Sequence, residues 1–159
     1  MLERELRWLV KAVFSGVELV WTEAAHGATY GQPDVSVPVP AKNVNSSIYK
    51  TRRETHWRLP IELKVWKQTR KGIECKLRPA QIRYHTIEAM SKRKSAIIAA
   101  VDGSEQIDLL VIPGHACPRT KYPEGGIRGK RIANVKAMSP DELRCKLENL
   151  FNAESFWGR

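Results

Sequence analysis

The sequence predicts a single α/β domain, with a mixed central β-sheet flanked by helices. One observation is that helical and strand-like patterns alternate along the chain as helix, three strands, helix, two strands, helix. Another is that the 159 residues contain no internal repeat and no linker-like stretch, and this length is enough for one domain with a substantial core. We expect the core over about 2–112, a basic loop over 113–138 and a C-terminal helix over 139–152.

Three segments combine apolar residues at helical spacing with signals for helix ends. Gly16 ends the first. Pro79 lies in the first turn of the second, where its missing N–H costs little. The third opens with Ser139-Pro140-Asp141-Glu142, a capping box with proline at the first helical position. The expected helices span 2–15, 78–94 and 139–152.

Five short apolar runs bounded by turn residues predict strands. Pro38 and Pro40 lack an N–H donor, so we expect their strand to run out at an edge of the sheet. The polar, basic residues 41–56 predict a loop or a hairpin excursion, and residues 67–72 a basic turn. The expected strands span 17–21, 34–39, 57–66, 95–101 and 106–112.

The charge of the chain points to a polyanionic partner. Lys and Arg total 27 against 17 Asp and Glu, a net charge of +10, and binding of cations to phosphates releases counterions. We therefore expect DNA as the ligand, held through its backbone by four basic runs, none of which reads bases. The expected DNA-binding residues are Lys50, Arg52, Arg53, Lys67, Arg70, Lys71, Arg78, Lys92, Arg93, Arg128, Lys130 and Arg131.

The cysteine pattern and the N-terminus indicate a cytoplasmic protein. Cys75, Cys117 and Cys145 are odd in number, far apart and without a CxxC pair, which argues against a disulfide framework and a zinc ribbon. The charged N-terminus is unlike a signal peptide, and no apolar stretch approaches the roughly 20 residues that span a bilayer. We expect no membrane partner, and the short chain would suit a phage or an archaeon.

The central expected strand carries two charges on one face. Glu62 and Lys64 are two positions apart, so they project to the same side of an extended chain. Ile61, Leu63 and Val65 project to the other side, into a core. A carboxylate and an ammonium on a core strand are costly unless they are paired or used in chemistry.

A second carboxylate, Asp34, starts another apolar strand. Mg²⁺ takes oxygen ligands, usually one or two carboxylates with water and substrate phosphate. Asp34, Glu62 and the backbone carbonyl of Leu63 are the expected ligands of Mg²⁺, with Mn²⁺ able to substitute. Lys64 would orient the attacking water or stabilise the pentavalent transition state of phosphodiester hydrolysis.

These residues resemble a known signature. Pro33-Asp34 followed by Glu62-Leu63-Lys64 is similar to the PD-(D/E)xK nuclease motif. With Glu3-Arg4-Glu5-Leu6, a glycine-containing loop before the aspartate and Arg78-x-x-Gln81, the pattern over roughly residues 2–112 resembles archaeal-type Holliday junction resolvases. The small virus-type VRR nucleases share much of it.

The resemblance implies a restriction-endonuclease-like fold and a metal-dependent endonuclease. Such an enzyme is usually a homodimer that places two active sites on a four-way DNA junction and makes paired, symmetrical cuts. This chain departs from the compact resolvases in its longer stretch between Asp34 and Glu62, and Thr29 is the nearest match to a small hydroxyl residue expected before the aspartate. The residues that the resemblance carries over as catalytic are Glu3, Asp34, Glu62, Lys64 and Gln81, with Glu3 also a metal ligand.

Several alternatives stay open at this stage. Glu5 could replace Glu3 as the carboxylate of the first helix. The substrate could be a flap, a fork or linear duplex, or the chain could be a non-catalytic nucleic-acid-binding module of the same fold. We expect His85 and Glu88 to form a surface pair, at i and i+3 of a helix. We expect the five tryptophans to serve in the core and in interfaces rather than to stack on bases, and Trp66, on the face of Glu62 and Lys64, is the one to test for contact with DNA.

Overall fold

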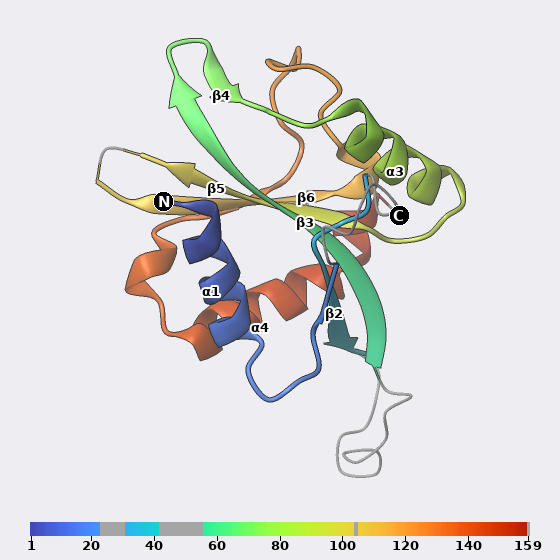
Figure 1. The fold of residues 1–159 in the computed structure, drawn as a ribbon, viewed down its shortest axis with the longest axis vertical. Helices are drawn as coiled ribbons and strands as arrows, with labels where there is room; N and C mark the ends of the chain where they lie inside the picture. The colour runs from blue at the N-terminus through green and yellow to red at the C-terminus, as the bar shows by residue number, and fades with distance from the viewer. Residues whose placement is uncertain (23–30, 42–55, 104, 159) are drawn as a thin grey trace.

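The computed structural model describes residues 1–22, 31–41, 56–103 and 105–158 (Figure 1). Thr29 and three of the expected DNA contacts, Lys50, Arg52 and Arg53, lie outside these residues. The helices and strands are α1 (Glu3–Val13), β1 (Val20–Trp21), β2 (Val35–Pro40), β3 (His56–Thr69), β4 (Gly72–Glu74), α3 (Pro79–Met90), β5 (Ala96–Asp102), β6 (Ile107–Pro113), β7 (Lys130–Ile132) and α4 (Pro140–Phe151). Short 3₁₀ helices are η2 (Gly114–Ala116), η3 (Val135–Ala137) and η4 (Glu154–Trp157).

The strands form one mixed sheet, as the sequence predicts. Within the described residues its order is β1-β2-β3-β5-β6-β7, and β4 pairs with the far end of β3. β3 and β5 run parallel, whereas every other neighbouring pair is antiparallel. α3 supplies the crossover that a parallel pair requires. The expected α/β fold, with helices flanking a mixed sheet, is confirmed.

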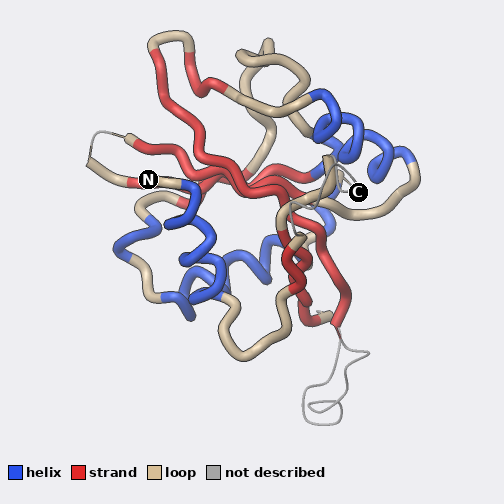
Figure 2. The backbone as a smooth tube through the Cα atoms, in the orientation of Figure 1, coloured by secondary structure: helices blue, strands red, loops and turns tan. Residues whose placement is uncertain are grey.

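The helices cover the two faces of the sheet unequally. α1 and α4 lie together on one face, and α3 lies on the other (Figures 1 and 2). The α1/α4 side holds the larger apolar cluster, in which Leu6 and Phe151 pack with Ile61 and Leu63 of β3. A smaller cluster on the α3 side is built around Trp66 and Ile97.

Two expected strands differ from the structure in length. β3 continues to Thr69 and turns through Arg70 and Lys71 into β4, where the sequence predicted only a basic turn; Gly72 provides the positive φ of +115°. The strand expected over 17–21 contracts to Val20–Trp21.

The loop expected over 113–138 also contains regular structure. It holds β7, which pairs antiparallel with β6, between η2 and η3. Arg131 of β7 donates to Asp108 of β6 at 2.7 Å from Nε to Oδ2, a contact between distant segments that a local pattern does not reveal.

Other predicted features are observed. β1 pairs with β2 only at Val35 and Ser36, so Pro38 and Pro40 lie in the part of β2 with no β1 neighbour. The Ser139 side chain caps α4 by accepting from the N–H of Glu142. No helix in the described parts of the chain is long and apolar enough to cross a bilayer.

Candidate active site

The pairing of β2 with β3 brings two carboxylates together. The antiparallel register matches Val35 with Ile61. Asp34 directly precedes β2, so one further step of the same register places it opposite Glu62. Residues opposite each other in an antiparallel pair project to the same face. The face is the one covered by α3, because Ile61 belongs to the cluster on the α1/α4 side.

Asp34 is fixed by contacts to both of its carboxylate oxygens. The N–H of Leu63 donates to Oδ2 at 2.8 Å, and Arg7 Nη2 donates to Oδ1 at 2.9 Å. The backbone carbonyl of Asp34 accepts from the N–H of Thr22 at 2.8 Å. The carboxylate therefore holds a defined position at the start of β2, joined to β3 and to α1.

Glu62 is nearly inaccessible, with 2% of its surface exposed. Gln81 Nε2 donates to its Oε1 at 2.5 Å, and Lys64 Nζ lies 3.6 Å from the same oxygen. Its other oxygen, Oε2, is buried without a hydrogen-bond partner in the described structure. Burial, and then the nearby charge of Asp34, raise the pKa of Glu62 to about 8, against the opposing effect of Lys64.

Gln81 reaches the carboxylate from the first turn of α3. Its side-chain Oε1 accepts from the N–H of Arg78 at 2.9 Å, which caps the helix and leaves the amide nitrogen for Glu62. The sequence predicted this glutamine at the site, and the structure places it in contact with Glu62.

The first helix contributes a cation to this site. Glu3 is exposed, and no contact within the described residues joins it to Asp34 or Glu62. Glu5 instead accepts from the N–H of Leu2 at the helix start. Arg7, one turn after Glu3, contacts Asp34. Because residues i and i+4 share a helix face, a site contact expected for Glu3 also indicated that Arg7 could reach the site.

The described residues give the carboxylate pair no third acidic neighbour. Among the described residues, no group of three or more His, Cys, Asp or Glu is gathered so that it could hold a metal ion. The role of Glu3 as a ligand therefore stays a prediction.

Next to Lys64 lies a basic pocket of about 470 Å³. In the described part of the chain no carboxylate lines it, and its cations are Lys64, Lys76, Arg78, Arg119 and Lys121. Lys76 and Lys121 are partly neutralised by Glu74, at 3.1 and 3.4 Å. Arg78 and Arg119 have no ion-pair partner in the part of the chain that the structure describes.

The sequence predicted Arg78 among the DNA contacts, whereas Arg119 and Lys121 were expected only as members of a basic run over 119–131, and Lys76 was not named. The segment that holds Arg119 and Lys121 follows β6 and η2, and only the fold brings it to the face of Glu62 and Lys64. The backbone contact from the N–H of Cys75 to the carbonyl of Lys121, at 2.8 Å, joins this segment to the chain that follows β4.

The remaining expected DNA contacts lie in separate places. Lys67, Arg70 and Lys71 are exposed on the β3–β4 hairpin, and Lys92 and Arg93 follow α3. Arg128 and Lys130 are exposed at and before β7, whereas Arg131 is engaged by Asp108. These cations therefore lie on several separate elements rather than in one cluster.

One sequence-based expectation is confirmed and one is wrong. Trp66 is a core residue, as expected for the tryptophans: only 1% of it is exposed, because residues of the smaller cluster cover it, and its Nε1 donates to the carbonyl of Lys76 at 3.3 Å. His85 is fully buried and shares a 2.8 Å hydrogen bond with Ser95 Oγ, and burial lowers its pKa to about 4. Its expected partner, Glu88, pairs with Arg93 instead.

The cysteines are free, as predicted. Burial raises the pKa of Cys75 to about 11 and that of Cys117 to about 12. Both are therefore neutral thiols at physiological pH rather than thiolate ligands or nucleophiles.

Comparison with known proteins gives a limited result. No protein-family model matches the chain, and no curated protein matches it. Among solved structures it is similar to Hjc, a Holliday junction resolvase from the archaeal hyperthermophile Archaeoglobus fulgidus, at 16% sequence identity and a TM-score of 0.42. The match covers 89% of this chain and 96% of that one. At this level of similarity, the function has to be argued from the site itself.

Proposed function

We propose that this protein is a metal-dependent endodeoxyribonuclease of the PD-(D/E)xK type that resolves branched DNA, such as Holliday junctions, by paired symmetrical cuts. The observation that carries the proposal is the pair of Asp34 and Glu62, opposed on β2 and β3 with Lys64 beside them. A buried carboxylate with a raised pKa, next to a second carboxylate and a lysine, is typical of a catalytic site rather than of a structural ion pair.

The donor set fits a divalent cation such as Mg²⁺ or Mn²⁺. Glu62 Oε2 is a buried acceptor without a donor in the described structure, which is the condition that a cation would relieve. Because the N–H of Leu63 points at Asp34, its carbonyl faces the same edge of β3. Asp34, Glu62 and the Leu63 carbonyl would hold the ion. When bound, it would supply a hydroxide at neutral pH and charge stabilisation at phosphorus.

The remaining residues would position the reaction. Gln81 fixes Glu62 through Oε1 and so leaves Oε2 for the ion. Lys64 lies at the mouth of the basic pocket, where it would meet the negative charge that develops on the phosphate. Arg78 and Arg119, which line the same pocket, would hold the strand next to the cut.

Branched DNA is the proposed substrate because the cations lie on several separate elements. Contacts to backbone phosphates position a protein on DNA without reading its sequence. Symmetrical cutting of a four-way junction needs two sites in a fixed relation, so the proposal includes a homodimer. Flaps, forks and linear duplex are the alternative substrates of the same site.

The test is a cleavage assay with Mg²⁺ on labelled four-way junction, flap, linear duplex and single strand. We expect paired nicks in the junction. Asp34→Asn and Glu62→Gln should each lower the rate at least about 10³-fold, the loss of roughly 4 kcal/mol of transition-state stabilisation. Both variants should still bind the junction. Glu142→Gln, an equivalent change at an exposed position of α4, is the matched control.

Other outcomes would revise the proposal at different levels. Full activity of either carboxylate variant would overturn the metal-site assignment. Cleavage confined to flaps or duplex would keep the site and replace the substrate. Binding without cleavage of any substrate would leave a non-catalytic nucleic-acid-binding module. In that case Asp34 would have a structural role, through the hydrogen bonds that both of its carboxylate oxygens accept.

A further inference from the structure

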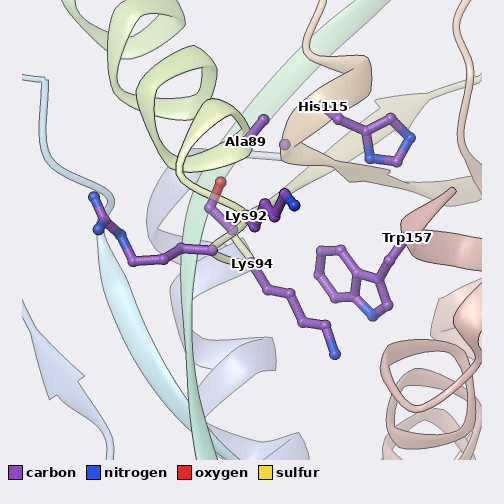
Figure 3. A pocket seen from close by; sticks show the side chains of 8 residues that line it. Ala89, Lys92, Lys94, His115 and Trp157 are labelled. Atoms are coloured by element: carbon purple, nitrogen blue, oxygen red, sulfur yellow. The ribbon is translucent and has the colours of Figure 1, made fainter. Parts of the chain in front are cut away.

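We propose that a pocket at the C-terminal end of α3 is a second phosphate-binding subsite, which holds a backbone phosphate of the DNA at a distance from the carboxylate pair. The inference rests on the proposed function for the identity of the ligand. The pocket measures about 480 Å³ and opens between the end of α3, η2 and η4. Figure 3 shows Lys92 and Lys94 on one side of it and His115 and Trp157 on the other.

The charge around this pocket selects an anion. Among the described residues, Lys92, Arg93 and Lys94 line it together with His115, and no carboxylate does. Glu88 lies outside the lining and holds Arg93 by two hydrogen bonds of 3.0 Å. A guanidinium fixed in this way is oriented before any ligand arrives, which lowers the entropy cost of binding.

Aromatic rings hold a second cation in place. Lys94 Nζ lies 4.8 Å from the ring centroid of Trp57 and 5.4 Å from that of Trp157. Such contacts to ring faces restrain a long side chain that would otherwise sample many rotamers. The pocket therefore presents cations held from two separate parts of the chain.

The backbone of Lys92 is the strongest sign that this lysine has a use. α3 ends in a Schellman motif, in which the N–H of Arg93 bonds to the carbonyl of Glu88 and the N–H of Lys92 to that of Ala89. Lys92 occupies the left-handed position of the motif, with φ of +58°. Glycine is the favoured residue there, because a Cβ is strained in this conformation. A lysine in that position is therefore strained, and strained residues cluster at binding sites.

The floor of the pocket also depends on a missing side chain. A Cβ on Gly114 would come within 2.3 Å of Ser95 Oγ, the atom that bonds to buried His85. Glycine at this position lets η2 approach the start of β5, which shapes the cavity between them.

The position of the subsite indicates what kind of ligand could use both sites. Arg78 and Lys92 lie at opposite ends of α3, and fourteen residues of helix rise give a separation of about 20 Å. This corresponds to roughly six base pairs along a duplex at about 3.4 Å each. A DNA arm that extends past the cut could contact both sites, whereas a single nucleotide could not.

The substitution Lys92→Gly separates binding from stability. It removes the cation and installs the residue that the backbone prefers, so the melting temperature should be no lower than that of the wild type and up to about 3 °C higher. In EDTA, the affinity for a fluorescein-labelled duplex of about 30 base pairs should fall roughly three- to tenfold. The dependence of log Kd on log salt should lose about one unit of slope.

Two controls match the two effects of this change. Asn134→Gly makes the same substitution at the other left-handed non-glycine position of the described chain, with φ of +53°, without removing a charge. Lys146→Ala removes an exposed cation from α4, on the opposite face of the sheet. Neither should alter affinity by more than about twofold.

Unchanged affinity and salt slope in Lys92→Gly would overturn the subsite while leaving the nuclease proposal untouched. Weakened binding by this variant, in a protein that cuts no DNA, would overturn the nuclease and support the subsite as a nucleic-acid contact. The two proposals therefore fail independently.

Discussion

The two faces of β3 carry different kinds of residues, apolar on one face and ionisable on the other. Ile61 and Leu63 project into the large apolar cluster under α1 and α4, where each is almost fully buried. Glu62 and Lys64, their immediate neighbours, project beneath α3 into a region that also holds a basic pocket. Alternation along one strand therefore separates stabilising residues from chemical ones at a spacing of one residue. A sheet can therefore carry a buried ionisable group on one face because its other face is packed.

The largest expected effect tests the packed face. Ile61→Ala should lower the free energy of unfolding by about 2–5 kcal/mol, because it opens a cavity in a cluster that cannot collapse around it. Urea denaturation monitored by tryptophan fluorescence measures this loss. Val20→Ala, at a half-exposed apolar residue of β1, should cost less than about 1 kcal/mol. Similar losses at both positions would contradict the division between the faces.

The second effect tests the chemical face through pH. The pKa of Glu62 is about 8 in the folded protein against 4.5 as its ordinary value. Between these values the folded state holds a proton that the unfolded state has released, so stability should fall as pH rises from about 4.5 to about 8. The slope contributed by this group is at most about 1.4 kcal/mol per pH unit.

Glu62→Gln should remove this slope from the metal-free protein. Asp34→Asn, which removes the neighbouring charge, should instead shift the upper end of the pH window downward. Urea denaturation in EDTA across the pH range, compared among the three proteins, measures both changes. If the stability of the wild type depends on pH in the same way as that of Glu62→Gln, the glutamate is charged throughout this range.

Local pattern was sufficient for much of the fold and for the central part of the site. Period-two alternation assigned Glu62 and Lys64 to one face, and the helix signals around Pro79 put Gln81 in a first turn. These signals lie within a few residues of the feature that they predict. The sequence-based boundaries failed where long-range pairing decides them, as in the extension of β3 to Thr69 and in β7.

Long-range contacts also explain which features of the site the sequence could not predict. Arg119 reaches the face of Glu62 and Lys64 only because its segment is bonded to the chain after β4, and nothing in its neighbours indicates this contact. Alternation placed Trp66 on the same face but could not show which residues cover it. His85 was expected at the surface for a similar reason, since its partner Ser95 belongs to another element.

The smallest expected effect tests the one contact that links α1 to the carboxylate pair. Arg7 donates to Asp34, and its guanidinium also lies 5.3 Å from the ring centroid of Trp21. Lys11, on the same helix, lies 5.3 Å from the same ring and pairs with no carboxylate of the described residues. Under the proposed function, Arg7 repels an incoming divalent cation and occupies Oδ1 of Asp34, an oxygen that could otherwise bind the cation.

Arg7→Met should therefore tighten binding of Mn²⁺ several-fold, an effect of about 1 kcal/mol for a charge removed near the protein surface. Its cost in folding stability should stay below about 1 kcal/mol, because the ion pair is partly exposed. Lys11→Met loses the same kind of ring contact and should leave Mn²⁺ affinity unchanged. Isothermal titration with Mn²⁺ measures the difference. Equal affinities in the two variants would mean that Arg7 supports Asp34 structurally without competing with the metal.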